Sequence, residues 1–134
     1  MKALMTASAL FLAALGIGAS FLPQELLARA GSPADGFTIT LVQLAGASWI
    51  AAAAVNWTAR GTLIGGIYGR PIGLGNFAQF MIGAIVLWKA VPRGHASAGL
   101  IALTVSYSVF AAWFGYALFS AGPRATSRPA SAPV

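Results

Sequence analysis

The chain has 134 residues, of which 58% are hydrophobic, and its eight basic and two acidic side chains give a formal net charge of +6. A soluble domain carries about 25% charged residues to cover its surface. The 7% found here excludes an ordinary water-soluble globule. There is no cysteine, which excludes a disulfide framework, a thiolate metal site and a cysteine nucleophile.

Four uninterrupted apolar stretches follow one another along the chain: residues 3–22, 39–58, 72–91 and 98–120. Each is about 20 residues long, the length with which an α-helix crosses a bilayer. All seven prolines lie outside the stretches, and so do all the charged residues except Lys89, which stands close enough to a boundary for its ammonium to reach the headgroups. Because the stretches do not alternate as barrel strands do, the sequence predicts helices.

We therefore predict an all-α integral membrane protein in which residues 1–120 form an antiparallel up-down bundle of four transmembrane helices. Short connections favour this order because they make successive helices neighbours. Residues 121–134 are rich in proline, alanine and serine without apolar periodicity, and predict a disordered cytoplasmic tail.

The first stretch is followed by Ala28-Arg29-Ala30, a small-x-small sequence that resembles a signal-peptide cleavage site. Its apolar region is longer than the roughly 7–15 residues of a signal peptide, so we expect a retained helix. Basic residues in the connections then favour cytoplasmic N- and C-termini in a bacterial inner membrane. Five basic residues fall inside in this orientation and three outside: Lys2, Arg60, Arg70, Arg124 and Arg128 against Arg29, Lys89 and Arg93.

Small or weakly polar residues form one narrow stripe along each apolar stretch, for example Ser8, Gly16 and Ser20 in the first. Such stripes are typical of closely packed transmembrane helices, which is the simpler interpretation. The alternative is an internal cavity for a flat apolar ligand such as a quinone, a porphyrin or a sterol-like lipid. Its candidate lining residues are Gln43, Trp49, Gln79, Tyr107, Ser108 and Trp113.

Catalytic groups are missing from the apolar stretches. None contains Asp or Glu, which disfavours a carrier built around a membrane carboxylate, and the single histidine, His95, falls in a short connection. No Ser-His-Asp set, carboxylate pair, phosphate-binding loop or metal-ligand cluster is apparent. We predict a non-enzymatic protein without a metal or cofactor. No basic stripe interleaved with aromatic residues is present either, so nucleic acid is not an expected partner.

The segment between the second and third stretches, residues 56–77, is rich in glycine and holds two arginines. Glycine permits close backbone approach, so Arg60 and Arg70 are predicted to converge on one anion, such as a lipid headgroup or the acidic face of a protein. Asn56, Tyr68 and Asn76 complete this candidate site. The alternative is a compact basic turn that only sets the topology.

The same segment reads N-W-x-x-R-G-x-x-x-G-G-I-Y-G-R-P-x-x-x-G-N, from Asn56 to Asn76. It resembles a group of small bacterial four-span membrane proteins loosely similar to the DoxX-like superfamily. The sequence from Phe21 to Glu25 fits the same pattern, and the resemblance covers roughly residues 10–90. It implies a four-helix inner-membrane fold and no particular chemistry.

Two functions follow as expectations. The first is an accessory module that binds a lipid or hydrophobic ligand, has an anion-binding Arg/Gly loop, and works as a homo-oligomer or with a membrane-protein partner. Its expected surroundings are the lipid bilayer and anionic lipid headgroups. The alternative is a small oligomeric channel or transporter lined by Gln43, Asn76 and Gln79.

Overall fold

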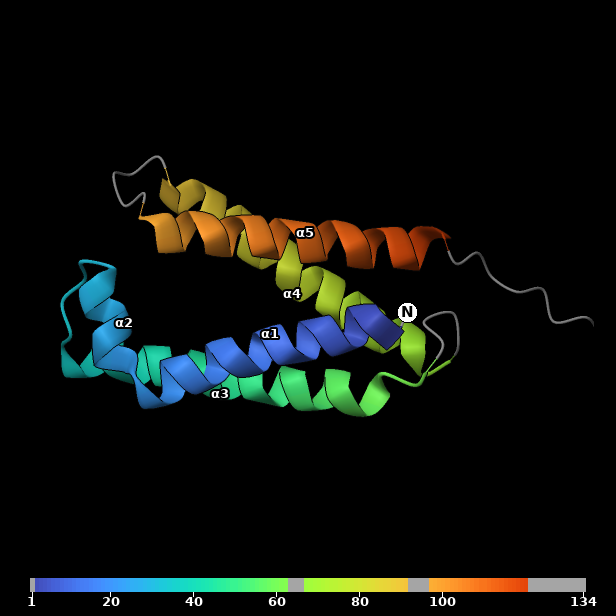
Figure 1. Ribbon diagram of the computed structural model, residues 1–134, viewed down its shortest axis with the longest axis horizontal. Helices are drawn as coiled ribbons and strands as arrows, with labels where there is room; N and C mark the ends of the chain where they lie inside the picture. The colour runs from blue at the N-terminus through green and yellow to red at the C-terminus, as the bar shows by residue number, and fades with distance from the viewer. Residues whose placement is uncertain (1, 63–66, 92–96, 121–134) are drawn as a thin grey trace, which may run out of the picture.

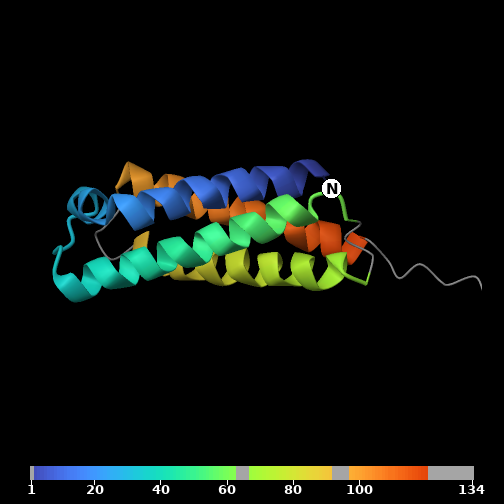
Figure 2. The same ribbon diagram turned by 90° about the horizontal axis from the view of Figure 1, so that it is seen from below.

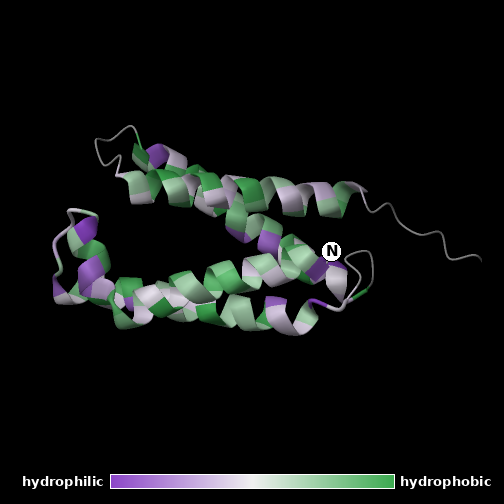
Figure 3. Cartoon of the chain, in the orientation of Figure 1, coloured by the Kyte–Doolittle hydropathy of each residue, from purple (hydrophilic) through white to green (hydrophobic). Residues whose placement is uncertain are grey.

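The computed structural model describes residues 2–62, 67–91 and 97–120, and within them it contains helices and no strand (Figure 1). The helices are α1 (Lys2–Phe21), α2 (Pro23–Arg29), α3 (Gly36–Ala59), α4 (Gly69–Ala90) and α5 (Ala98–Ser120). The four long helices α1, α3, α4 and α5 are long and apolar enough to cross a membrane. Apolar residues dominate their length, as the colouring in Figure 3 shows. The predicted all-α class with four membrane-length helices is confirmed.

The helix boundaries agree with the predicted stretches to within about one turn. α3 begins earlier than predicted because Asp35 caps it: the carboxylate accepts hydrogen bonds from the backbone N–H groups of Phe37 and Thr38, both at 3.0 Å. The Thr38 hydroxyl adds a hydrogen bond of 2.7 Å, and this bond, followed by the backbone ones, lowers the pKa of Asp35 below its ordinary value. The predicted tail, residues 121–134, and His95 lie outside the described residues.

Helix α2 lies in the connection after the first stretch, where the sequence analysis predicted no helix. The helix begins at Pro23, and the missing N–H of proline costs no hydrogen bond there because the first N–H groups of a helix have no partner within it. Leu27 of this helix is buried. Glu25 in the first turn and Arg29 in the last suit the helix dipole. Seven residues are too few to show up in a search for membrane-length apolar stretches, so the pattern missed it.

The long helices form two hairpins. α1 packs chiefly against α3, and α4 chiefly against α5, while the contacts between α3 and α4 are few (Figures 1 and 2). The expectation that successive helices are neighbours therefore holds only weakly for α3 and α4. Their connection is short, but each helix finds its main partner elsewhere.

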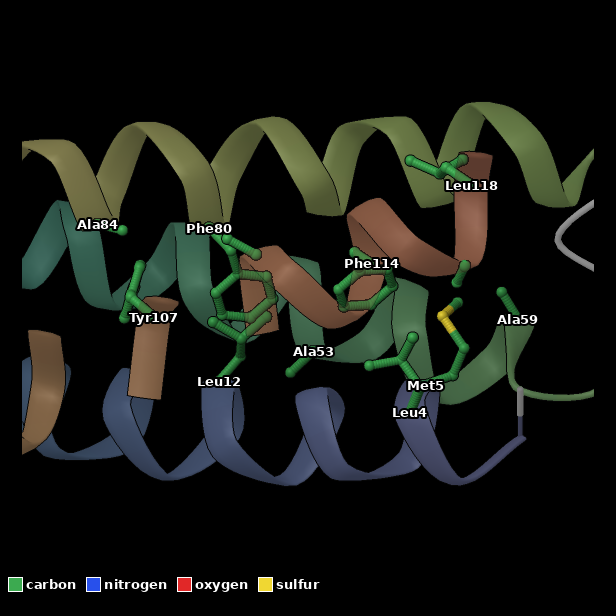
Figure 4. Packing of buried hydrophobic residues seen from close by; sticks show 12 residues of the cluster. Leu4, Met5, Leu12, Ala53, Ala59, Phe80, Ala84, Tyr107, Phe114 and Leu118 are labelled. Atoms are coloured by element: carbon green, nitrogen blue, oxygen red, sulfur yellow. The ribbon is translucent and has the colours of Figure 1, made fainter. Parts of the chain in front are cut away.

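The two hairpins meet in an aromatic cluster near the middle of the molecule, part of which Figure 4 shows. Phe80 of α4 is fully buried and stacks on Phe110 of α5 with ring centroids 4.8 Å apart. Phe11 of α1 reaches across to the same rings, at 5.1 Å from Phe110 and 6.0 Å from Tyr107. Close ring pairs of this kind stabilise packing beyond the area they bury. The cluster is therefore the main apolar connection between the hairpins.

Candidate functional site

A pair of buried asparagines joins α3 to α4 near their connected ends. Asn56 Nδ2 donates a hydrogen bond to Asn76 Oδ1 at 2.6 Å, and Asn76 Nδ2 donates to Asn56 Oδ1 at 2.7 Å. Asn56 Nδ2 also donates to Ser8 Oγ of α1 at 3.1 Å, and Asn76 Nδ2 to the Ile72 carbonyl at 2.9 Å. We call Ser8, Asn56 and Asn76 the amide cluster. It uses all four amide N–H groups inside the protein and connects three helices.

The amide cluster forms part of the wall of a groove between α3 and α4. The groove has a volume of about 230 Å³ and is open to the surroundings. We call it the amide groove; its lining residues are Ala52, Val55, Asn56, Ile72, Gly75, Asn76 and Gln79. It is thus a mostly apolar surface with amide groups at a few positions, which is a common composition for a ligand or partner site.

Arg60 lies at the end of α3, folded back over Trp57. Its guanidinium carbon is 4.1 Å from the centre of the Trp57 ring, and Nη1 donates to the Trp57 carbonyl at 2.8 Å. The carbonyl belongs to the last turn of the helix, where a cation is favoured by the helix dipole. These contacts fix the position of the charge. They use only part of the guanidinium, which has five N–H donors.

Tyr68 and Arg70 lie at the start of α4 and are exposed, Tyr68 to 81%. Residues 63–66, between Arg60 and Tyr68, lie outside the described part of the chain. No hydrogen bond within the described ranges connects Arg60 to either side chain. The structure thus brings together Asn56 and Asn76 of the predicted loop site, and convergence of Arg60 with Arg70 stays a prediction.

A second groove runs along α1 and α3 and ends at Trp57. It has a volume of about 370 Å³, and we call it the apolar groove. Its lining residues are Ala9, Leu10, Ala13, Ile50, Ala53, Ala54 and Trp57, without a polar side chain apart from the indole. The small alanines leave the space of this open groove, and the larger side chains border it. Its surface matches a hydrocarbon chain, and the Arg60 charge stands over the tryptophan at its end.

The predicted internal lining residues occupy different places. Tyr107 is buried, and Trp49 of α3 is partly buried beside its hydroxyl. Ser108 accepts a hydrogen bond of 3.1 Å from Trp88 Nε1, which connects α4 and α5. Gln79 lines the amide groove.

The other two predicted lining residues face outward. Gln43 is exposed and donates to the Ser20 carbonyl of α1 at 3.3 Å. Trp113 is 44% exposed. Gln43 and Trp113 are thus more exposed than Tyr107, and lining of one internal cavity by all six residues stays a prediction. The stripes of small residues do lie at helix contacts, where the backbones of Gly16 in α1 and Gly46 in α3 approach each other closely.

Trp88 is a structural residue that the sequence interpretation did not assign, and Ser8 is one whose partner it did not identify. Trp88 stands next to Lys89 near the end of α4, a position typical of a tryptophan at the membrane surface. Its pairing with Ser108 across 20 residues is not visible in the sequence. Ser8 lies on the predicted packing stripe, which was the available sequence signal, and the structure shows it to be buried.

Comparisons with known proteins add no relative: no family model, curated protein or solved structure matches this chain.

Proposed function

We propose that this protein is a non-enzymatic bacterial inner-membrane module that binds an anionic lipid at the end of α3. The acyl chain lies in the apolar groove and the headgroup meets Arg60. Cytoplasmic N- and C-termini, the resemblance to DoxX-like proteins, and action together with a second copy or a membrane-protein partner are parts of the same proposal.

The observation that carries the proposal is the position of Arg60 over Trp57 at the end of the apolar groove. A hydrocarbon surface and a fixed cation at its end match the two parts of an anionic lipid. Tryptophan is enriched at the level of the headgroups, so we expect the Arg60 guanidinium at the depth of the lipid phosphates. The guanidinium suits phosphate because it presents several N–H donors in one plane.

The distribution of charge also supports a headgroup site at the Arg60 end of the molecule. α1 and α3 run antiparallel, so Lys2 lies near the Arg60 end of the hairpin, and Arg70 begins α4 after the connection from α3. The two acidic residues of the chain, Glu25 and Asp35, lie at the other end, on α2 and before α3. An anionic headgroup at Arg60 therefore meets a basic surface without a carboxylate beside it. A juxtamembrane basic residue contributes about 1 kcal/mol to binding an anionic membrane surface.

The test is native mass spectrometry of the protein purified in mild detergent, followed by titration with phosphatidylglycerol. We expect Arg60→Gln to weaken phosphatidylglycerol binding about fivefold, since one basic residue contributes about 1 kcal/mol. Arg29→Gln, at the opposite end, is the matched control with the same charge change and should bind as the parent protein does. Ala54→Leu fills the groove and should weaken binding of both phosphatidylglycerol and phosphatidylethanolamine.

Equal lipid binding by the parent protein and by Arg60→Gln would refute the headgroup assignment. Unchanged binding by Ala54→Leu would refute the groove. A far-ultraviolet circular dichroism spectrum of each variant shows that the helices are retained.

The alternative function, a small channel or transporter, has support from the amide groove, where Asn76 and Gln79 place polar groups inside the membrane. A solute flux in liposomes that Gln79→Leu abolishes would favour it over lipid binding. The internal pairing of all Asn56 and Asn76 donors leaves few groups to replace a hydration shell, so we place it second.

A further inference from the structure

Gln79 is a polar side chain at the middle of a membrane helix. It lies ten residues after Gly69 and eleven before Ala90, which is about 15 Å from each end of α4 at 1.5 Å per residue. It is partly exposed in the amide groove, and no described residue forms a hydrogen bond with its amide. Hydrocarbon chains offer neither a donor nor an acceptor at this depth. The amide therefore needs a polar partner beyond the residues that the structure describes.

Gly75 lies one helical turn before Gln79 and lines the same groove. A Cβ atom built on it meets nothing within 4 Å, in contrast to Gly16, Gly46, Gly83 and Gly115, where such an atom approaches neighbouring atoms to 3.0 Å or less. No packing against the described residues thus explains a glycine here, although glycine in a helix costs about 1 kcal/mol relative to alanine. An outward-facing glycine permits close approach of a helix from another molecule.

We propose that a second copy of this chain docks on this surface, with the two α4 helices crossing at Gly75 and Gln79. The two Gln79 amides then pair across a two-fold axis, each donating to the other's carbonyl oxygen. A two-fold contact requires a residue that pairs with its own copy, and an amide, which carries donors and an acceptor, is such a residue. The surrounding exposed residues of α4, Ala78 and Ile82, lie on the same helix face and complete the contact.

The molecule already contains the proposed interaction in another place. Asn56 and Asn76 form a reciprocal amide pair at 2.6 and 2.7 Å within the membrane-length helices. The face around Gln79 also carries no charge, because Arg70 and Lys89 lie near the two ends of α4. Two copies can therefore meet there without burying like charges. A lipid acyl chain would be the alternative occupant of the groove, but it offers no hydrogen bond to the Gln79 amide.

Cysteine cross-linking tests the contact directly, because the chain has no cysteine of its own. Ala78→Cys places a thiol beside the proposed axis, and Val109→Cys is the matched control at the middle of α5, where the side chain is 54% exposed. We expect oxidation in proteoliposomes at low protein density to give a disulfide-linked dimer of Ala78→Cys and not of Val109→Cys. Equal cross-linking of the two variants would mean random collision and would overturn the proposal.

The Gln79 amide is tested in the Ala78→Cys background. Gln79→Leu should lower the dimer association constant about fivefold, the effect of about 1 kcal/mol from interhelical side-chain hydrogen bonding. Gln43→Leu removes another amide from the membrane helices, one that donates to Ser20 in the same chain, and should leave the association constant unchanged. Dimerisation that survives Gln79→Leu at full strength would refute the amide pairing.

The two proposals can be refuted separately. Arg60→Gln is expected to weaken lipid binding and to cross-link normally through Ala78→Cys, whereas Gln79→Leu is expected to weaken the dimer and to bind phosphatidylglycerol as the parent protein does.

Discussion

The two hairpins use glycine in different ways. In the α1–α3 hairpin, Gly16 and Gly46 bring two backbones together: a Cβ atom on Gly46 would lie 2.8 Å from the Ser20 nitrogen and 2.9 Å from the Gly16 carbonyl oxygen. In the α4–α5 hairpin, Gly83 makes room for a ring, and the nearest atoms to its Cβ position belong to Tyr107, at 2.5 and 2.6 Å. A backbone cannot move without moving its helix, whereas a ring can turn or be truncated.

The connection between the hairpins is different again. It combines an aromatic cluster around Phe80 with the amide cluster of Ser8, Asn56 and Asn76. In lipid, apolar side chains gain little from leaving the surrounding hydrocarbon, so close packing and hydrogen bonds determine which helices associate. The hairpins are therefore the units of close packing, and a few specific contacts determine how the two hairpins are placed relative to each other.

Gly46→Ala is expected to have the largest effect on stability. Its methyl group meets backbone atoms, so the helices must separate, and we expect a loss of about 3 kcal/mol in the free energy of unfolding, the upper range for overpacking. Reversible unfolding by sodium dodecyl sulfate in mixed micelles, followed by circular dichroism, measures it. Gly75→Ala, whose Cβ position is open within the chain, is the matched control and should not destabilise the monomer. An unchanged free energy of unfolding in Gly46→Ala would mean that the backbones are not in close contact.

Gly83→Ala should cost less, about 1–2 kcal/mol, because the obstacle is a side chain. The same unfolding assay also distinguishes the two hairpins by rescue. In the Tyr107→Ala background the added methyl group meets no ring, so Gly83→Ala should have almost no further cost there. Full additivity of the two substitutions would contradict the ring-on-glycine contact, since neighbouring residues are expected to couple.

Removing one partner of the amide cluster should have the smallest effect of the three. Asn56→Leu leaves Asn76 with unpaired amide groups, and we expect a loss of about 1 kcal/mol, typical of side-chain hydrogen bonds between membrane helices. The double variant Asn56→Leu/Asn76→Leu should cost little more than either single one, because the two residues satisfy each other. A double-mutant cycle with no coupling energy would show that the pair does not hold the hairpins together.

Much of the fold was predictable from the sequence because the membrane imposes it. Charged residues and prolines are excluded from the centre of a bilayer helix, so their positions mark the ends of α1, α3, α4 and α5 to within about one turn. Helix α2 was missed since it is short and lies outside these stretches. The small-residue stripes predicted close contacts, and Gly16 and Gly46 confirm this.

The candidate site was less predictable. Asn56 and Asn76 stand out in the sequence as polar residues one or two turns inside helix ends, but their reciprocal hydrogen bonds depend on how α3 and α4 approach each other. The same holds for Trp113, a candidate lining residue whose side chain is 44% exposed in the structure. Neither spacing nor composition reports the rotation of one helix about its axis relative to another.

The scarcity of charge, ten side chains in 134, thus determined by itself the environment of this protein and the limits of its membrane helices, because burying charge in hydrocarbon is costly for any arrangement of helices. Only the tertiary structure decided which helices pair, which amides satisfy one another, and that Gln79 has no hydrogen-bond partner among residues 2–62, 67–91 and 97–120. Those outcomes depend on contacts between residues far apart in the sequence, which are fixed when the helices pack and not before.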